Sequence, residues 1–221
     1  MSVATLSPHI DRPPGRPLVY SDIRDQIRTG DILLFQGQSP LSRLIRWGSG
    51  SDYSHAGFTA WWEHRLLVFQ ASGRGAEILP VSSAVDAYDG QVDWYALRPE
   101  HRLSHECEQQ LVTHAVTLLG RAYSRVGLAD LMWRMARGRF RGRPDTKACP
   151  DTMFCSQYVS YCFRMVGPDL VVDTDDGSTS PGDLSRSPLL ELRGVLHANA
   201  AQKAARRSEA LPGRPRGQET K

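Results

Sequence analysis

Strand-like and helix-like segments occupy different halves of this chain of 221 residues. Between residues 31 and 99 the apolar stretches are short and end at turn-forming residues, which is typical of β-strands. From residue 104 onward, apolar residues instead recur at the spacing of amphipathic helices. This separation predicts an α+β fold, in which an antiparallel sheet packs against helices around one core as a single domain.

Five segments of the first half are predicted to be strands. The first follows directly after Gly30 and is uniformly apolar, which favours a buried strand. The second and third are separated only by Glu63 and His64, which predicts a tight turn between them. The five segments are 31–35, 53–62, 65–71, 76–81 and 90–99.

Serine residues are placed to begin three of the predicted helices. We expect Ser21, Ser39 and Ser104 to be the N-caps, and we expect Gly30 to end the first of these helices. Two more helices are predicted, one over about 126–137 and one that begins at or near Cys155. The ordered part should close with turns and one helical turn over 178–190.

The two ends of the chain differ from this middle part. Residues 1–19 are rich in proline and polar residues and predict an extended arm, residues 20–197 predict the folded domain, and residues 198–221 predict a disordered basic tail. The first residues lack the apolar core of a secretory signal peptide, and no stretch approaches the ~18 apolar residues of a membrane span. We therefore expect a cytoplasmic protein, with export by a signal-independent route as the alternative.

Positive charge is concentrated in the segment 134–147 and in the tail, although the net charge is only +3. Both could contact phosphates or anionic lipid, so a weak contact of 134–147 with a membrane surface stays open. A solvated loop and a disordered end are the commoner explanation. Since Phe140 is the single aromatic residue of this segment, base stacking has no support and no nucleic-acid partner is expected.

Cys155 precedes a predicted helix, where the unpaired N–H groups of a helix N-terminus can lower the pKa of a thiol. The ordinary explanation is a small buried residue, because free cysteine usually packs. Cys162 lies two turns further along the same stripe and is expected to be structural. The four cysteines match no zinc template, and neither a metal nor an organic cofactor is expected.

A thiolate nucleophile needs a histidine partner, and His55 is the best candidate among seven. It is the only histidine placed inside a predicted strand, and the small residues Ala56 and Gly57 that follow would let another element approach closely. A strand histidine is nevertheless more often a packing residue than a base.

Several strings, taken in order, resemble the circularly permuted branch of the NlpC-type papain-fold hydrolases, the YiiX-like family. They are GDILLF (30–35), YSHAGF (53–58), VFQAS (68–72), FCSQYVSYCF (154–163) and STSPGDLSRSP (178–188). The resemblance implies a permuted papain-like fold in which the histidine strand precedes the cysteine helix. It also implies that Cys155 is the nucleophile, His55 the base and Gln70 the third polar residue.

Gln70 departs from the acid that many members of that family carry. An amide can accept a hydrogen bond from a histidine ring and so fix its tautomer, but it brings no charge. The alternative is an exposed polar residue on an alternating strand.

Tyr53 and Ser156 are further candidates for the site. Tyr53 lies two residues before His55, so both side chains should share a face, and its hydroxyl could join the backbone N–H of Cys155 in an oxyanion hole. Aromatic packing explains Tyr53 equally well. Ser156 could line the substrate site, while capping or exposure explains it as well. Asp31 is expected to be a turn or cap group.

These residues predict a cysteine hydrolase of amide or ester bonds. By resemblance, the expected substrate is a peptide or acyl-amide, with peptidoglycan-type peptides first. The alternatives are a lipid-directed acyl hydrolase or acyltransferase of the same fold, and a non-catalytic binding module.

Overall fold

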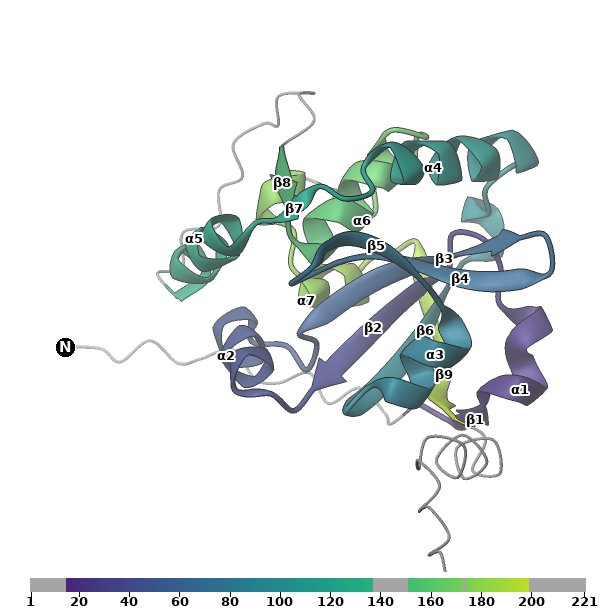
Figure 1. The fold of residues 1–221 in the computed structure, drawn as a ribbon, viewed down its shortest axis with the longest axis horizontal. Helices are drawn as coiled ribbons and strands as arrows, with labels where there is room; N and C mark the ends of the chain where they lie inside the picture. The colour runs from purple at the N-terminus through teal and green to yellow at the C-terminus, as the bar shows by residue number, and fades with distance from the viewer. Residues whose placement is uncertain (1–14, 137–150, 173, 199–221) are drawn as a thin grey trace, which may run out of the picture.

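A seven-stranded sheet runs through the molecule in the order β1-β9-β6-β2-β3-β4-β5 (Figure 1). The computed structural model describes residues 15–136, 151–172 and 174–198. All neighbouring strands are antiparallel except β1 and β9, which are parallel, so the sheet is mixed rather than purely antiparallel as expected. The strands are β1 (Pro17–Val19), β2 (Ile32–Gly37), β3 (His55–Trp62), β4 (Arg65–Ser72), β5 (Gly75–Pro80), β6 (Gly90–Leu97) and β9 (Leu190–His197).

All five predicted strand segments are strands in the structure. The β3–β4 hairpin closes through Glu63 and His64 as expected, and Glu63 adopts a positive φ of 52° there. Two strands of the sheet were not predicted. β1 uses the last residues of the expected arm, and β9 lies beyond the segment expected to close the fold. A separate pair of short parallel strands, β7 (Ala122–Tyr123) and β8 (Thr152–Met153), was also not predicted.

The helices largely follow the capping signals. Ser39 and Ser104 accept hydrogen bonds from the backbone N–H groups of Ser42 and Cys107, which confirms both N-caps. The prediction for Ser21 is wrong, because the first helix begins at Tyr20 and leaves Ser21 inside it. The helices are α1 (Tyr20–Ile23), α2 (Pro40–Ser49), α3 (Val81–Ala87), α4 (His105–Thr117), α5 (Arg125–Ala136), α6 (Cys155–Arg164) and α7 (Pro181–Ser185).

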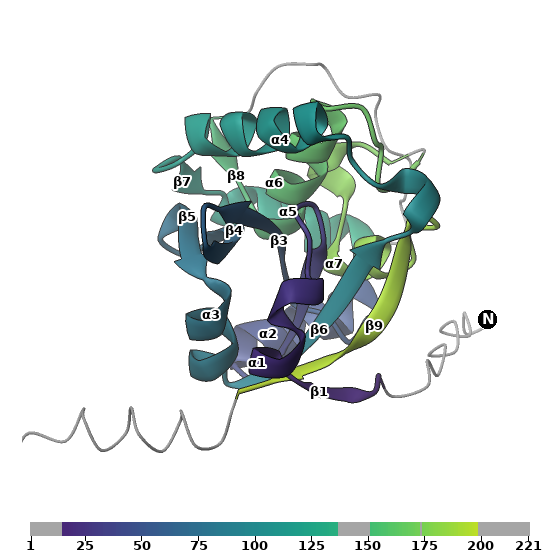
Figure 2. The same cartoon turned by 90° about the vertical axis from the view of Figure 1, so that its right-hand side faces the viewer.

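Hydrophobic clusters lie on both faces of the sheet. On one face, Phe58 contacts the rings of Tyr158 and Phe163 from α6, so this helix packs directly on the sheet. On the other face, Leu33, Phe35 and Val68 pack with residues of α1 and α3. Figure 2 shows α4 and α6 on one side of the strands and α1 and α3 on the other. This arrangement brings the N-terminus of α6 to the sheet.

Part of what the sequence predicts falls outside the described residues. This holds for the tail after residue 198, most of the arm, and residues 137–147 of the basic segment. Among the helices that the structure describes, none has the length and apolar character that crossing a bilayer requires.

Candidate active site

Cys155 is the first residue of α6 and is buried, with 2% of its surface exposed. The N-cap residue, Phe154, has an extended backbone and gives no side-chain hydrogen bond to the helix. Burial opposes the thiolate, but the charge and the hydrogen bond of His55, together with the backbone N–H groups of Ala56 and Ser156, lower the pKa of Cys155. The thiol predicted to be reactive therefore lies at an uncapped helix N-terminus beside an imidazole.

Buried hydrogen bonds attach α6 to the segment that follows it. The Ser156 hydroxyl donates to the backbone oxygen of Thr179 at 2.7 Å, and the Ser160 hydroxyl donates to Asp176 at 2.7 Å. Arg164 makes an ion pair with the same carboxylate. The next helix, α7, begins with a capping box between Ser180 and Asp183. The segment from Asp176 to Asp183, which overlaps the polar string at 178–188, thus holds the cysteine helix in place.

His55 is the first residue of β3, and its ring packs on Phe35 with the ring centroids 5.1 Å apart. Burial disfavours the imidazolium, yet the charge and hydrogen bond of Cys155, the hydrogen bond of Gln70 and the charge of Glu77 together raise the pKa of His55. The pKa of the base is thus raised and that of the nucleophile lowered, which favours a thiolate–imidazolium pair.

Gln70 lies on the neighbouring strand, and its Oε1 atom is 2.9 Å from Nε2 of His55. Gly57 makes this contact geometrically feasible, because it pairs with Gln70 and lies two residues after His55. A Cβ atom on Gly57 would lie 2.8 Å from Val68 Cγ2 and 3.3 Å from Gln70 Cβ. With Nε2 bonded to Gln70, Nδ1 is the ring nitrogen that faces Cys155.

Glu77 is a site residue that the sequence reasoning missed. Its Oε1 atom accepts a hydrogen bond of 3.1 Å from the Gln70 side-chain amide, and its Oε2 atom lies 3.0 Å from the Arg74 guanidinium. The glycine-containing string SGRG at 72–75 is typical of a tight turn, and this signal could have identified Glu77. A two-residue turn at Gly73 and Arg74 pairs Gln70 with Glu77 on adjacent strands.

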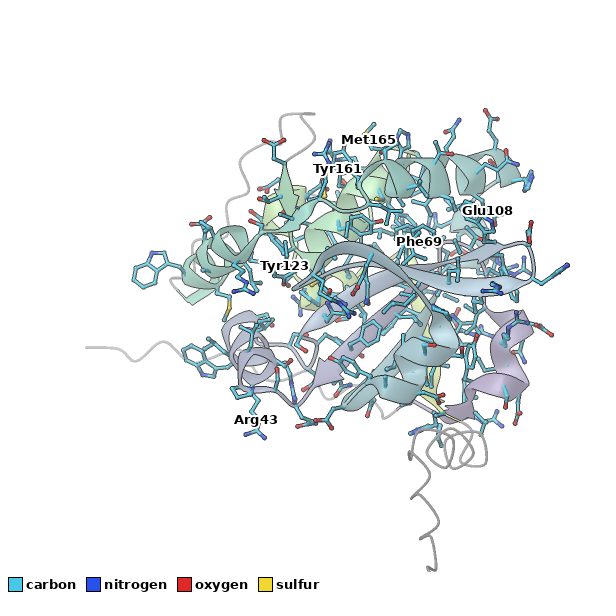
Figure 3. The ribbon with its side chains drawn as sticks, in the orientation of Figure 1. Arg43, Phe69, Glu108, Tyr123, Tyr161 and Met165 are labelled. Atoms are coloured by element: carbon cyan, nitrogen blue, oxygen red, sulfur yellow. The ribbon has the colours of Figure 1, made fainter. Side chains whose placement is uncertain are left out.

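Two tyrosines near the thiol were also missed. Burial, with a contribution from the charge of Cys155, raises the pKa of both Tyr88 and Tyr123. Tyr88 follows α3 and Tyr123 belongs to β7, neither of which was predicted. Figure 3 shows Tyr123 on the side of the sheet where α2 and α5 lie. Both tyrosine rings therefore lie near the thiol, and both belong to segments whose structure the sequence did not predict.

Tyr53 and the Ser156 hydroxyl are placed differently from what was expected. Tyr53 precedes β3 and packs in the cluster under α6, while His55 packs on Phe35 of the other cluster, so the two do not share a face. The Tyr53 hydroxyl donates to Asp93 at 2.6 Å and lies 2.8 Å from the Tyr95 hydroxyl. Its role in an oxyanion hole stays a prediction. The Ser156 side chain is fully buried against Thr179, so only its backbone N–H faces the thiol.

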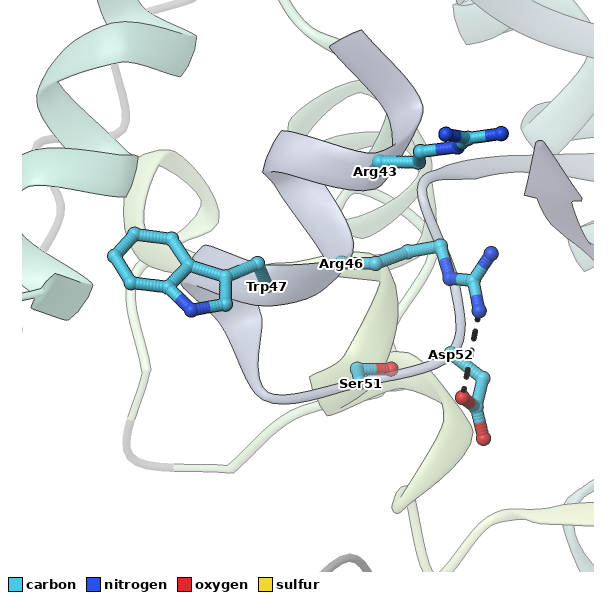
Figure 4. Close-up of a pocket in the computed structure, with 5 residues that line it drawn as sticks. All are labelled: Arg43, Arg46, Trp47, Ser51 and Asp52. Carbon is cyan, nitrogen blue, oxygen red and sulfur yellow. Dashed lines mark ion pairs between the residues drawn. The ribbon is translucent and has the colours of Figure 1, made fainter. Parts of the chain in front are cut away.

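An open depression of about 350 Å³ lies along α2 and the loop that leads to His55. Figure 4 shows Arg43 and Arg46 on one side of α2 and the Trp47 ring on the other, with an ion pair of 3.8 Å between Arg46 and Asp52. Neither Cys155 nor His55 lines it. The depression is therefore distinct from the candidate site.

Side chains that could hold a metal are not grouped in the described part of the chain. No set of three or more histidine, cysteine, aspartate or glutamate residues converges there. Cys107, Cys155 and Cys162 form no disulfide.

A solved structure with the same fold is among the five chains of known structure that match this one. It is the crystal structure of metalloprotein yiiX from Escherichia coli O157:H7, which is 21% identical in sequence and superimposes with a TM-score of 0.57. The match covers 76% of this chain and 96% of the other. No protein-family model matches the sequence, and no curated protein matches it. The likeness therefore supports the YiiX-like architecture.

Proposed function

We propose that this protein is a cysteine hydrolase of amide or ester bonds, with Cys155 as nucleophile, His55 as base and Gln70 as the residue that orients the base. The observation that carries this proposal is the imidazole of His55, which interacts with Cys155 through one nitrogen and with Gln70 through the other. A structural cysteine requires neither partner.

The reaction follows from the charges of this pair. The Cys155 thiolate attacks the carbonyl carbon of the substrate, and the imidazolium of His55 gives its proton to the leaving amine or alcohol. The product of this step is a thioester on Cys155. A water molecule then gives a proton to His55 and attacks the thioester, which releases a carboxylic acid and restores the thiolate and imidazolium.

The helix N-terminus supplies donors for the oxyanion that forms in both steps. The N-cap residue Phe154 makes no side-chain hydrogen bond to the first turn of α6, so no side chain caps the backbone N–H groups there. Such groups, together with the positive end of the helix dipole, stabilise developing negative charge. The backbone N–H of Cys155 is the donor that we assign to this role.

Peptidoglycan-type peptides are the substrate class that we favour. The support is the ordered resemblance to the permuted NlpC-type papain-fold hydrolases, together with the shared fold of YiiX. YiiX is described as a metalloprotein, but the residues of this site do not fit a metal, since Cys155 and His55 interact with each other and the third group is an amide.

The acyl-enzyme gives a direct test. The protein is mixed with soluble peptidoglycan fragments and, separately, with phospholipid micelles, and its intact mass is measured after rapid acid quenching. We expect the wild-type protein to gain the mass of a substrate-derived acyl group, and we expect Cys155→Ala to show no such gain. With neither an adduct nor product release in any mixture, the hydrolase proposal would be wrong and a binding scaffold would be favoured.

A lipid-directed acyl hydrolase is the second candidate, and the surface of α2 favours it. The exposed side of this helix carries Leu41, Leu44 and Trp47, with Trp47 75% exposed. Its polar Ser42 and Arg46 turn toward the protein instead, where Arg46 donates to the backbone oxygen of Gly37. An apolar outer face with an aromatic residue and a nearby exposed Arg43 suits the surface of an anionic bilayer.

Vesicle binding separates the two candidates. Sedimentation with phosphatidylglycerol vesicles should retain the wild-type protein and release Trp47→Ala, while phosphatidylcholine vesicles should retain little of either. Trp62→Ala is the matched control, because Trp62 is also exposed but lies in the β3–β4 hairpin. Equal binding of all three proteins would remove the support that α2 gives to the lipid alternative.

A further inference from the structure

The side-chain amide of Gln70 lies between an imidazole and a carboxylate. Its oxygen is 2.9 Å from Nε2 of His55, and its nitrogen donates to Glu77 at 3.1 Å. Glu77 is mostly buried, with 18% of its side chain exposed, whereas its outer partner Arg74 is 75% exposed. Cys155, His55, Gln70 and Glu77 therefore form a continuous chain of polar contacts that ends near the surface.

The Glu77 carboxylate determines the orientation of the Gln70 side-chain amide. An amide can present either its oxygen or its NH₂ group to a neighbour, but an ionised carboxylate only accepts hydrogen bonds. The NH₂ group of Gln70 must therefore face Glu77, and its oxygen must face His55. That oxygen requires a proton on Nε2, and in a neutral ring this leaves Nδ1 unprotonated toward Cys155. Without Glu77, the amide could rotate and favour the opposite tautomer.

Glu77 also supplies the negative charge that Gln70 lacks. A carboxylate one hydrogen bond beyond the ring stabilises the imidazolium, although less than a carboxylate in direct contact. Its position is set by the hairpin, because Gly57, Gln70 and Glu77 lie side by side on β3, β4 and β5. The Glu77 side chain thus both places a negative charge near the His55 ring and controls the tautomer of that ring.

We propose that Glu77 is a positioning residue of the active site, which orients the Gln70 amide and thereby selects the His55 tautomer that can accept a proton from Cys155. This inference rests on the proposed function, since it gives the histidine the role of a base. It adds a fourth residue that neither the resemblance nor the shared fold assigns.

Alkylation of Cys155 by iodoacetamide between pH 5.5 and 9 tests the proposal without a known substrate. Glu77→Ala is expected to slow alkylation at pH 6 by about tenfold, the value of roughly one hydrogen bond to a charged group, and to move the profile to higher pH. Glu77→Gln keeps an acceptor without a charge, so its rate should lie between those of Glu77→Ala and wild type. Arg74→Ala is the matched control and should leave the profile unchanged.

A second readout distinguishes positioning from a general structural effect. At a pH high enough for the His55 ring to be neutral, the ¹⁵N chemical shifts of the ring should report an Nε2–H tautomer in wild type and a mixture of tautomers in Glu77→Ala. In a Gln70→Ala background, removal of Glu77 should slow alkylation clearly less than it does in the wild-type background, because the positioning effect acts through Gln70 and only the effect of the charge remains. Thermal unfolding of each variant identifies any loss of fold, and Glu77→Gln, nearly isosteric, serves if the alanine variant unfolds.

Unchanged ring shifts and an unchanged profile in folded Glu77→Ala or Glu77→Gln would overturn the proposal. Full additivity of the Glu77 and Gln70 substitutions would overturn it as well. Either result would leave the hydrolase proposal standing as long as wild-type Cys155 is activated. If the wild-type thiol shows no activation, the hydrolase proposal fails first.

Discussion

The Nε2 atom of His55 lies 2.9 Å from Oε1 of Gln70, across two adjacent strands. This contact fixes the plane of the imidazole and assigns its two nitrogens to different partners. A ring held in this way can act as a base on one side only, which is the arrangement that papain-type chemistry requires.

Replacement of Gly57 should separate His55 from Gln70. A Cβ atom there would lie 2.8 Å from Val68 Cγ2 and 3.0 Å from the backbone oxygen of Phe69, so β4 must shift. We expect Gly57→Ala to slow alkylation of Cys155 at pH 6 by about tenfold. Gly73→Ala is the control, because a Cβ there meets nothing within 4 Å. Equal rates in the two variants would show that close approach at Gly57 is unimportant.

Removal of the Ser156 hydroxyl should affect stability rather than chemistry. The hydroxyl is buried and donates to the Thr179 backbone oxygen, which would lose its partner in Ser156→Ala. We expect the free energy of unfolding to fall by about 1 kcal/mol, with the alkylation rate of Cys155 nearly unchanged. Urea unfolding and alkylation measure the two quantities. A slow thiol in a variant of normal stability would restore the substrate-site role predicted for Ser156.

Tyr53→Phe tests the oxyanion role directly. Because the hydroxyl already donates to Asp93, we expect the variant to lose about 1–2 kcal/mol of stability and to keep its turnover number on an identified substrate. Steady-state kinetics and urea unfolding together check this. A fall of roughly 100-fold in turnover at normal stability is the loss expected for an oxyanion donor, and it would support the original assignment.

Asp31 should make stability depend on pH. It accepts hydrogen bonds from the backbone N–H groups of Arg28 and Leu97 and from the Trp94 indole, which confirms the turn role expected for it. Burial nevertheless raises the pKa of Asp31 from 3.8 to about 6. The folded state therefore holds this proton more tightly than the unfolded state, so stability from this group falls as pH rises from about 4 to about 6.

Comparison with Asp31→Asn isolates this effect from other carboxylates. The wild-type free energy of unfolding should decline relative to the variant by about 2 kcal/mol between pH 4 and pH 7. Urea unfolding at several pH values provides the measurement. A difference that stays constant, or grows with pH, would contradict the assignment.

The sequence predicted the elements that carry strong local signals. The cap residues Ser39 and Ser104 and the apolar stripe of α6 located three helices, because capping and helical periodicity are local properties. His55 and Cys155 followed from their elements, while Gln70 followed from the resemblance. The structure brings these three side chains into one polar chain.

Features that depend on register were missed. β9 breaks its alternation of apolar residues at Gly194, near the point where its pairing with β6 shifts between Trp94 and Tyr95. Glu77 is identified only when the hairpin pairing is known. Tyr53 was expected to share a face with His55 on the assumption that the strand began earlier, whereas β3 begins at His55.

The most direct test of the central claim is the rate at which each cysteine of the wild-type protein and of His55→Ala reacts with iodoacetamide at pH 6. An ordinary thiol loses reactivity about tenfold per pH unit below its pKa, but the lowered pKa of Cys155 and the raised pKa of His55 preserve the thiolate as the pH falls. We predict that Cys155 reacts well ahead of Cys107, Cys149 and Cys162, and that this lead disappears in His55→Ala. Equally slow reaction of all four cysteines, or a lead that persists without His55, would contradict the account.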